Sequence, residues 1–167
     1  PVEVVKLLNK YLSRMTEIIE ENGGVVVDFY GDGILAFFDR GRHNVPDCVM
    51  DALNSAIKMQ IALLSVSQEN LVEGLPELKM GIGIHTGQVV VGDIGSEKRG
   101  KYGVVGSAVN TTKRIESIAE GGMILISGET YMLIENRIRA IRMIQVELKG
   151  LEGIRDLFEI SWDGSNY

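Results

Sequence analysis

Residues 24–38 read Gly24-Val25-Val26-Val27-Asp28-Phe29-Tyr30-Gly31-Asp32-Gly33-Ile34-Leu35-Ala36-Phe37-Phe38. Two runs of β-branched and aromatic residues flank the turn-forming tripeptide Gly31-Asp32-Gly33, which predicts a β-hairpin over residues 25–39. Asp32 then lies at the tip, and Asp28 lies four residues earlier on the first strand. Taken alone, Asp32 is more often a simple turn residue than a metal ligand or a catalytic acid, because Asp-Gly is among the commonest hairpin turns.

Periodic apolar residues predict a helix on each side of this hairpin. They recur at spacings of three and four over residues 2–21, where Asn22-Gly23-Gly24 ends the helix, and again over about residues 47–66. Residues 40–46 and 67–76 are expected to be connections.

The second half of the chain predicts another hairpin and a third helix. We expect strands over residues 78–85 and 88–94, joined by a Thr86-Gly87 turn, and a glycine- and lysine-rich loop over residues 95–106. The remaining expected elements are a helix over 107–119, a strand over 123–126, a brief helix capped by Ser127 and reaching about Ile134, and strands over 143–148 and 156–161.

This order of elements predicts an α+β sandwich, in which helices pack on one face of a mainly antiparallel sheet. A length of 167 residues fits one domain, so residues 1–167 are expected to form a single domain. Because the chain starts Pro1-Val2-Glu3 and runs directly into a helix, we expect it to be part of a longer, multidomain polypeptide. An upstream membrane anchor or sensor is one possibility.

Composition narrows the class of protein. A hydrophobic content of 45% and a charged content of 24% are typical of soluble globular domains. The net charge of −6 argues against a general nucleic-acid binder. Cys48 is the only cysteine, which excludes an intrachain disulfide and a cysteine-based zinc site and fits a reducing compartment. No apolar run is expected to span a membrane, and no signal peptide is expected within residues 1–167.

Two glycine-rich motifs resemble nucleotide-binding fingerprints but depart from them. The segment from Gly95 to Tyr102 lacks the Ser or Thr that a P-loop needs after its Lys. The segment Gly81-Ile82-Gly83-Ile84-His85-Thr86-Gly87 is one residue too long for a dinucleotide motif, and its glycines lie within a strand. His85 has no second His or Cys at ligand spacing, so a structural, hydrogen-bonded role is expected.

The third helix carries a polar pair opposite its apolar stripe. Asn110 and Arg114 are an i,i+4 pair and are therefore neighbours on the helix surface. An amide beside a guanidinium can bind a phosphate or a ribose, but for this helix taken alone a plain solvated face is the favoured explanation. Lys149 is likewise either a solvated lysine or a phosphate ligand. The apolar stripe consists of Ala108, Thr112, Ile115 and Ala119.

Together these motifs resemble the catalytic domain of class III nucleotidyl cyclases, the adenylate and guanylate cyclases. Each motif is weak alone, but they occur in order over nearly the whole chain. The matching segments are Gly23-Gly24 with Phe29-Tyr30-Gly31-Asp32-Gly33, Gly81–Gly87, Val91-Gly92-Asp93-Ile94-Gly95, Gly106–Arg114, and Glu147-Leu148-Lys149-Gly150.

The resemblance implies an enzyme that cyclises a nucleoside triphosphate by attack of the ribose 3′-oxygen on the α-phosphorus, with release of pyrophosphate. Two Mg²⁺ or Mn²⁺ ions, held by two carboxylates, assist the reaction. Asp32 matches the second metal carboxylate, Asn110 the residue that orients the ribose, and Arg114 the residue that stabilises charge on the α-phosphate. Lys149 matches a triphosphate-binding lysine, and Lys98 or Arg99 aligns loosely with a further phosphate contact.

The resemblance also implies a head-to-tail homodimer with sites shared across the interface. Asp32 would come from one protomer and Asn110, Arg114 and Lys149 from its partner, so a monomer should be inactive. The expected partners are the nucleoside triphosphate and a second copy of the chain, without nucleic acid or membrane contact by this domain. The expected location is cytoplasmic, with the alternative of a cytoplasmic domain in a membrane-anchored or sensor-fused protein.

Two features depart from the family pattern. In the family's ferredoxin-like βαββαβ core, the first metal carboxylate lies on a strand before the first helix, and this strand is absent from residues 1–167. We expect it upstream; otherwise the piece should misfold, swap elements or be inactive. The two positions that choose the base hold Asp28 and Gly103, which match neither the adenylate nor the guanylate pair. ATP is expected over GTP from the prevalence of adenylate cyclases among bacterial-type members, and the alternative is a non-catalytic module for nucleotide binding or dimerisation in signalling.

Overall fold

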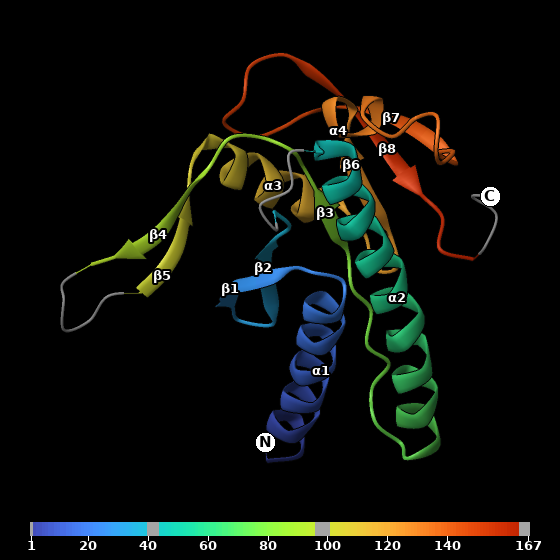
Figure 1. The fold of residues 1–167 in the computed structure, drawn as a ribbon. Coiled ribbons are helices and arrows are strands. Elements are labelled where there is room, and N and C mark those ends of the chain that lie inside the picture. Colours follow the sequence, from blue (N-terminus) through green and yellow to red (C-terminus); the bar gives the residue numbers. More distant parts are fainter. Residues whose placement is uncertain (1, 40–43, 96–100, 164–167) are drawn as a thin grey trace.

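The computed structural model describes residues 2–39, 44–95 and 101–163. The elements in chain order are α1 (Val2–Glu21), β1 (Val25–Tyr30), β2 (Gly33–Phe37), α2 (Val45–Val72), β3 (Ile82–Ile84), β4 (Val90–Ile94), β5 (Lys101–Val105), α3 (Ser107–Ile118), β6 (Ile124–Ser127), α4 (Gly128–Met132), β7 (Arg142–Glu147) and β8 (Ile154–Ile160) (Figure 1).

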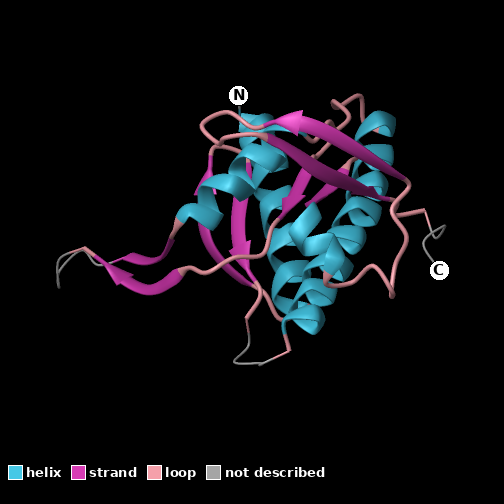
Figure 2. Ribbon diagram, turned by 90° about the horizontal axis from the view of Figure 1, so that it is seen from above, coloured by secondary structure: helices cyan, strands magenta, loops and turns pink. Residues whose placement is uncertain are grey.

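The described strands form three sheets. A four-stranded sheet has the order β3-β6-β8-β7, in which only the β3–β6 pair is parallel. The pairs β1–β2 and β4–β5 form separate antiparallel sheets of two strands each. Figure 2 shows the β4–β5 pair extending away from the other elements. The expected α+β class with a mainly antiparallel sheet is confirmed.

The prediction of a hairpin formed by residues 78–85 and 88–94 is wrong. β3 pairs with β6, while β4 pairs with β5, and Gly92 lies opposite Gly103. Residues 101–105 were expected to be loop, but Tyr102, Val104 and Val105 are good strand formers and the segment pairs with β4. The short turn expected at Thr86-Gly87 is absent because Gly87 lies against α3, where an added Cβ would be 2.5 Å from the Cβ of Ala108.

α2 extends beyond the expected range at both ends. It begins after the N-cap Asn44, whose side chain accepts a hydrogen bond from the Asp47 N–H, and it includes Pro46 in its first turn, where proline is well tolerated. It continues through the polar residues after 66, because Ser67 and Asn70 are buried and bind backbone. Ser67 Oγ lies 2.7 Å from the carbonyl oxygen of Leu78.

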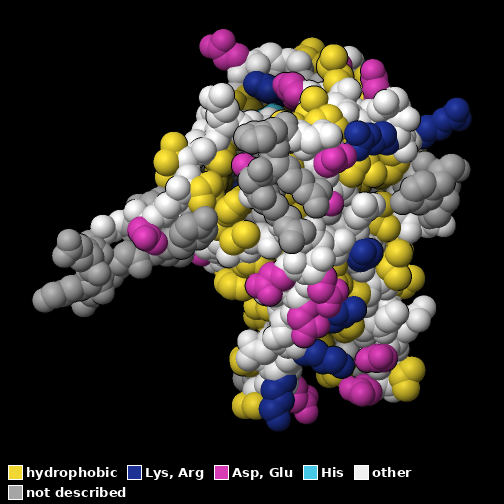
Figure 3. Space-filling model, viewed as in Figure 1, with side chains coloured by type: hydrophobic (Ala, Val, Ile, Leu, Met, Phe, Trp, Pro, Cys, Tyr) yellow, Lys and Arg dark blue, Asp and Glu magenta, His cyan; other side chains and the backbone are white. Residues whose placement is uncertain are grey.

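By length and composition, α2 is apolar enough to cross a membrane, contrary to the expectation from the sequence. Its inner face instead belongs to the core, where Leu53 is fully buried. Figure 3 shows charged side chains of both signs over the surface where α1 and α2 lie. We therefore describe α2 as a core helix of this domain.

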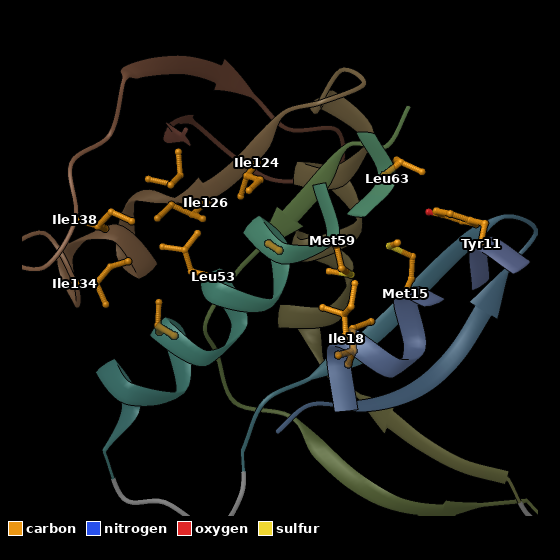
Figure 4. Close-up of a cluster of buried hydrophobic side chains, with 14 residues drawn as sticks. Tyr11, Met15, Ile18, Leu53, Met59, Leu63, Ile124, Ile126, Ile134 and Ile138 are labelled. Atoms are coloured by element: carbon orange, nitrogen blue, oxygen red, sulfur yellow. The ribbon is translucent and has the colours of Figure 1, made fainter. Parts of the chain in front are cut away.

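The main core lies between α1, α2 and the four-stranded sheet. Figure 4 shows Met15 and Ile18 of α1 facing Met59 of α2, with Leu53 directed toward Ile126 of β6. A second, smaller cluster lies under α3. It consists of Ile115, Leu125, Leu148 and Leu157.

The glycines of the Gly81-Ile82-Gly83 segment allow α3 to pack on β3 at backbone distance. A Cβ on Gly83 would lie 2.5 Å from the backbone nitrogen of Glu116, and one on Gly81 would overlap the backbone of Ala119. These glycines therefore serve helix packing, which agrees with the rejection of a dinucleotide motif.

Gly83→Ala should lower the free energy of unfolding by about 1–3 kcal/mol, because the added methyl group pushes α3 away from β3. Gly92→Ala is the matched control, since a Cβ there meets nothing within 4 Å, and its effect should stay within about 0.5 kcal/mol. Urea unfolding followed by circular dichroism measures both, and equal effects would contradict the role assigned to Gly83.

Candidate active site

The predicted hairpin is present and places Asp32 at its exposed tip. Tyr30 pairs with Gly33, and Gly31 adopts a φ of +61°, which a side chain would disfavour. The strands of the hairpin pack on the main core through Val26, Ile34, Ala36 and Phe38, so this contact reaches to the residue next to Gly33. The turn therefore exposes the Asp32 carboxylate to solvent, while apolar residues of the two strands hold the hairpin on the core.

A β-bulge turns Asp28 away from the core. The pairing skips Val27, since Val26 lies opposite Ala36 and Asp28 lies opposite Leu35. In a regular strand Asp28 would share the inward face of Val26, and the extra residue reverses this. Asp28 Oδ1 accepts a hydrogen bond of 2.9 Å from the Phe29 N–H. β1 also contacts β5, the strand that carries Gly103.

α3 exposes Asn110 and Arg114, as its pattern predicts. The buried residues are Ala108, Thr111 and Ile115, so Thr111 and not Thr112 faces the core. Thr112 is half-buried, and its hydroxyl donates a 2.7 Å hydrogen bond to the Ala108 carbonyl. The amide and the guanidinium thus lie side by side on the outer surface of a firmly packed helix.

Lys149 lies in the exposed turn after β7. Its neighbour Leu148 is buried in the same small cluster as Ile115, the residue after Arg114. This packing brings the Lys149 turn close to α3, so three of the expected ligands belong to one structural unit. Lys98 and Arg99 lie outside the described residues.

The tip of the hairpin meets a different flank of α3. Lys113 Nζ lies 4.1 Å from the centroid of the Tyr30 ring. Burial and, to a lesser degree, the Asp32 carboxylate raise the pKa of Glu116. At 100° per residue, Glu116 is about 160° around the helix from Arg114. Within one chain, Asp32 therefore faces the Lys113 and Glu116 flank.

Tyr11 of α1 completes this electrostatic group. Burial raises the pKa of its phenol to about 12, with smaller contributions from Asp32 and Glu116. Its hydroxyl donates to the sulfur of Met80 at 3.0 Å. Sequence patterns alone do not indicate a role for Tyr11, Lys113 or Glu116 in the site. The one sequence signal for Lys113 was its position three residues after Asn110, which places the two side chains near each other on the helix surface.

Asp32 fits a divalent cation as a single protein ligand. Its carboxylate is a hard oxygen donor at an exposed tip, and Mg²⁺ is commonly held by one or two carboxylates plus substrate phosphates. Within residues 2–39, 44–95 and 101–163, no three His, Cys, Asp or Glu side chains are grouped to hold a metal ion. Further ligands for a cation at Asp32 would therefore have to come from outside these described residues of one chain.

Comparison with known proteins assigns the chain to a family. Residues 1–160 match the family model described as the adenylate and guanylate cyclase catalytic domain. The chain belongs to this family. The family and the enzyme class expected from the sequence, a nucleotidyl cyclase, are thereby confirmed for the domain.

This cyclase domain is similar to proteins of both base preferences. It is 37% identical, over 96% of its length, to an adenylate cyclase of Anabaena cylindrica, of which it covers 32%. It is 44% identical to the guanylyl cyclase Cya2, covering 96% of this chain and 81% of that one with a TM-score of 0.88. It is 31% identical to the adenylyl cyclase CyaB of P. aeruginosa, covering 96% and 83% with a TM-score of 0.88. The domain thus spans about a third of the length of the curated relative.

His85 of the cyclase domain has the expected structural position. Its Nδ1 lies 2.7 Å from Ser127 Oγ, which lies 2.7 Å from Thr130 Oγ1, and Thr130 Oγ1 bonds to Thr86 Oγ1 at 3.1 Å. Burial lowers the pKa of His85, Glu129 opposes this effect, and Arg155 adds to it. The network joins the end of β3 to the N-cap of α4.

Because the pKa of His85 is lower in the folded domain than 6.5, the unfolded chain binds its proton first as the pH falls. The contribution of His85 to stability should therefore be full above about pH 6.5 and decline below it. The difference in Tm between wild type and His85→Gln should shrink from pH 7.5 to pH 5.5 in thermal unfolding scans. A constant difference would show that His85 titrates alike in both states.

Proposed function

We propose that this domain cyclises a purine nucleoside triphosphate to the 3′,5′-cyclic nucleotide at sites shared across a homodimer. The ribose 3′-hydroxyl gives up its proton to solvent, and its oxygen bonds to the α-phosphorus. The bond between the α-phosphorus and the oxygen that bridges to the β-phosphate breaks, and pyrophosphate leaves with that oxygen. The supporting observation is that Asn110 and Arg114 face outward while Asp32 of the same chain lies over another flank of α3. A second copy, packed head to tail, supplies the missing half of each site.

The roles follow from side-chain chemistry. The Arg114 guanidinium binds the α-phosphate oxygens and stabilises the negative charge that grows on them in the transition state. The Asn110 amide hydrogen-bonds the ribose and orients its 3′-oxygen. Lys149 neutralises the remaining phosphates, and Lys98 or Arg99 would add a further phosphate contact.

Asp32 would hold Mg²⁺ or Mn²⁺ together with the triphosphate oxygens. When bound, two such ions lower the pKa of the 3′-hydroxyl and neutralise the phosphate charge. The first metal carboxylate of the family pattern is proposed to lie on a strand outside residues 1–167. In support, β3 is an edge strand among the described strands, and the β1–β2 pair forms no ladder with it. A strand beside β3 would fit between these sheets.

ATP is proposed as the substrate from the prevalence of adenylate cyclases among bacterial-type members, and the similarity extends to an adenylate cyclase and to a guanylyl cyclase alike. GTP is the second candidate, because a specific observation favours it. The bulge directs Asp28 outward, and its carboxylate accepts the two neighbouring N–H donors on the edge of guanine. Gly103 adds no side chain that would discriminate between the bases.

The cytoplasm is the proposed location of the domain, in keeping with its triphosphate substrate. A non-catalytic module that binds nucleotide or dimerises remains the alternative function. The unusual pair of Asp28 and Gly103 at the base positions favours this alternative. Activity of the full-length protein decides between the two functions.

The full-length protein, assayed as a dimer with Mg²⁺ or Mn²⁺, should form cyclic AMP from ATP, with cyclic GMP from GTP measured in parallel. Arg114→Ala should lower kcat about 100-fold while changing KM little, because the guanidinium acts mainly in the transition state. Arg139→Ala, at an exposed position between α4 and β7, is the matched control and should change kcat less than about twofold. A dimer that forms no cyclic nucleotide from either substrate would support the non-catalytic module.

Shared sites predict complementation. Asp32→Ala and Asn110→Ala homodimers should each be inactive, whereas a mixed dimer contains one intact site and should regain up to about half of the wild-type activity per dimer. Separately tagged chains, purified in tandem, isolate the mixed dimer for the same assay. Failure of the mixture to regain activity would argue against the head-to-tail arrangement.

A further inference from the structure

The contact between Tyr30 and Lys113 connects the two functional elements of one chain. The Lys113 ammonium lies 4.1 Å from the centre of the Tyr30 ring, within the range of a cation–π interaction. Tyr30 is the last residue of β1 and directly precedes Gly31 and Asp32. Lys113 directly precedes Arg114 on α3.

Core contacts hold the strands of the hairpin as far as Ile34, whereas Gly31 and Asp32 in the turn are exposed. Its two strands form a sheet of their own, and a two-stranded sheet is marginally stable by itself. Near the tip, the Tyr30 side chain is 46% exposed and that of Phe29 is 49% exposed. Gly31 adds backbone freedom to the turn. The exact position of Asp32 therefore depends in part on what Tyr30 contacts.

We propose that Tyr30 and Lys113 form a positioning pair, through which α3 holds the hairpin tip and thereby places the Asp32 carboxylate. This inference rests on the shared-site function proposed above. In the dimer, α3 of a protomer presents Asn110 and Arg114 to one site, while the hairpin it holds presents Asp32 to the other. Each protomer then contains a direct side-chain link between the two sites.

A simpler role for Lys113 predicts that its replacement lowers the activity of the other site of the dimer. As a cation near Asn110 and Arg114, Lys113 could bind substrate phosphate in the site that its own α3 serves. A positioning role instead affects the site that receives Asp32 from the same chain. The two roles are separated by placing a Lys113 variant in only one protomer of a mixed dimer.

The experiment uses the mixed dimer of Asp32→Ala and Asn110→Ala chains. Its one intact site takes Asp32 from the Asn110→Ala chain and Asn110 from the Asp32→Ala chain. Lys113→Met in the Asn110→Ala chain lies on the helix of the disabled site, yet it should lower kcat of the intact site about two- to fivefold, the factor expected for an exposed cation–π contact. The metal concentration for half-maximal activity should rise with it.

Matched variants identify the contact. Lys113→Arg in the same chain keeps a cation over the ring and should restore kcat, and Tyr30→Phe should retain it where Tyr30→Leu does not. Tyr30→Leu combined with Lys113→Met should lose no more activity than either change alone, since both remove one interaction.

Three results would overturn the inference while the proposed function stands. These are an unchanged kcat with Lys113→Met in the Asn110→Ala chain, an equal loss with Lys113→Arg, and losses that multiply in the double variant. A wild-type dimer without cyclase activity would overturn the proposed function and this inference together.

Discussion

α3 rests on the backbone of β3, and this steric contact decides where the outward-facing side chains of the candidate site lie. Gly81 and Gly83 leave no side chain between strand and helix, while Ile115 anchors the same helix in the smaller core cluster. The packing of α3 on β3 and on the smaller core cluster therefore fixes the direction in which Asn110 and Arg114 point. Leu148 belongs to the same cluster, so the turn that carries Lys149 is positioned by the same contacts.

The hairpin complements this rigid helix with a less firmly held element. Its bulge directs Asp28 to the outer face, and its turn carries Asp32 to the tip, so two carboxylates four residues apart point to different places. Such an arrangement suits a chain that contributes to two sites at once. In the proposed dimer, the Asp28 carboxylate would meet the base and the Asp32 carboxylate the cation.

Local patterns predicted much of this architecture. The hairpin, α1 and the exposed face of α3 follow from alternation, helical periodicity and glycine stops, which act within a few residues. Pairing partners distant in the chain were not predictable in this way. β3 joins β6 in parallel, although residues 78–94 have the pattern of a local hairpin. Likewise, the polar residues Ser67 and Asn70 looked like a loop because the carbonyls that they bind lie outside their own helix. The contact of Tyr30 with Lys113 joins residues too far apart for any local pattern to reveal.

The buried polar residues of α2 also limit how this domain can change during evolution. Gln60, Ser67 and Asn70 bind the backbone of Met80, Leu78 and Pro76, so the helix holds this extended segment in register as a neighbouring strand would. Inserting or deleting one residue between Gln60 and Asn70 would rotate the following side chains by about 100° and separate them from these carbonyls. Homologous sequences should therefore conserve the spacing within this helix more strictly than its amino acids.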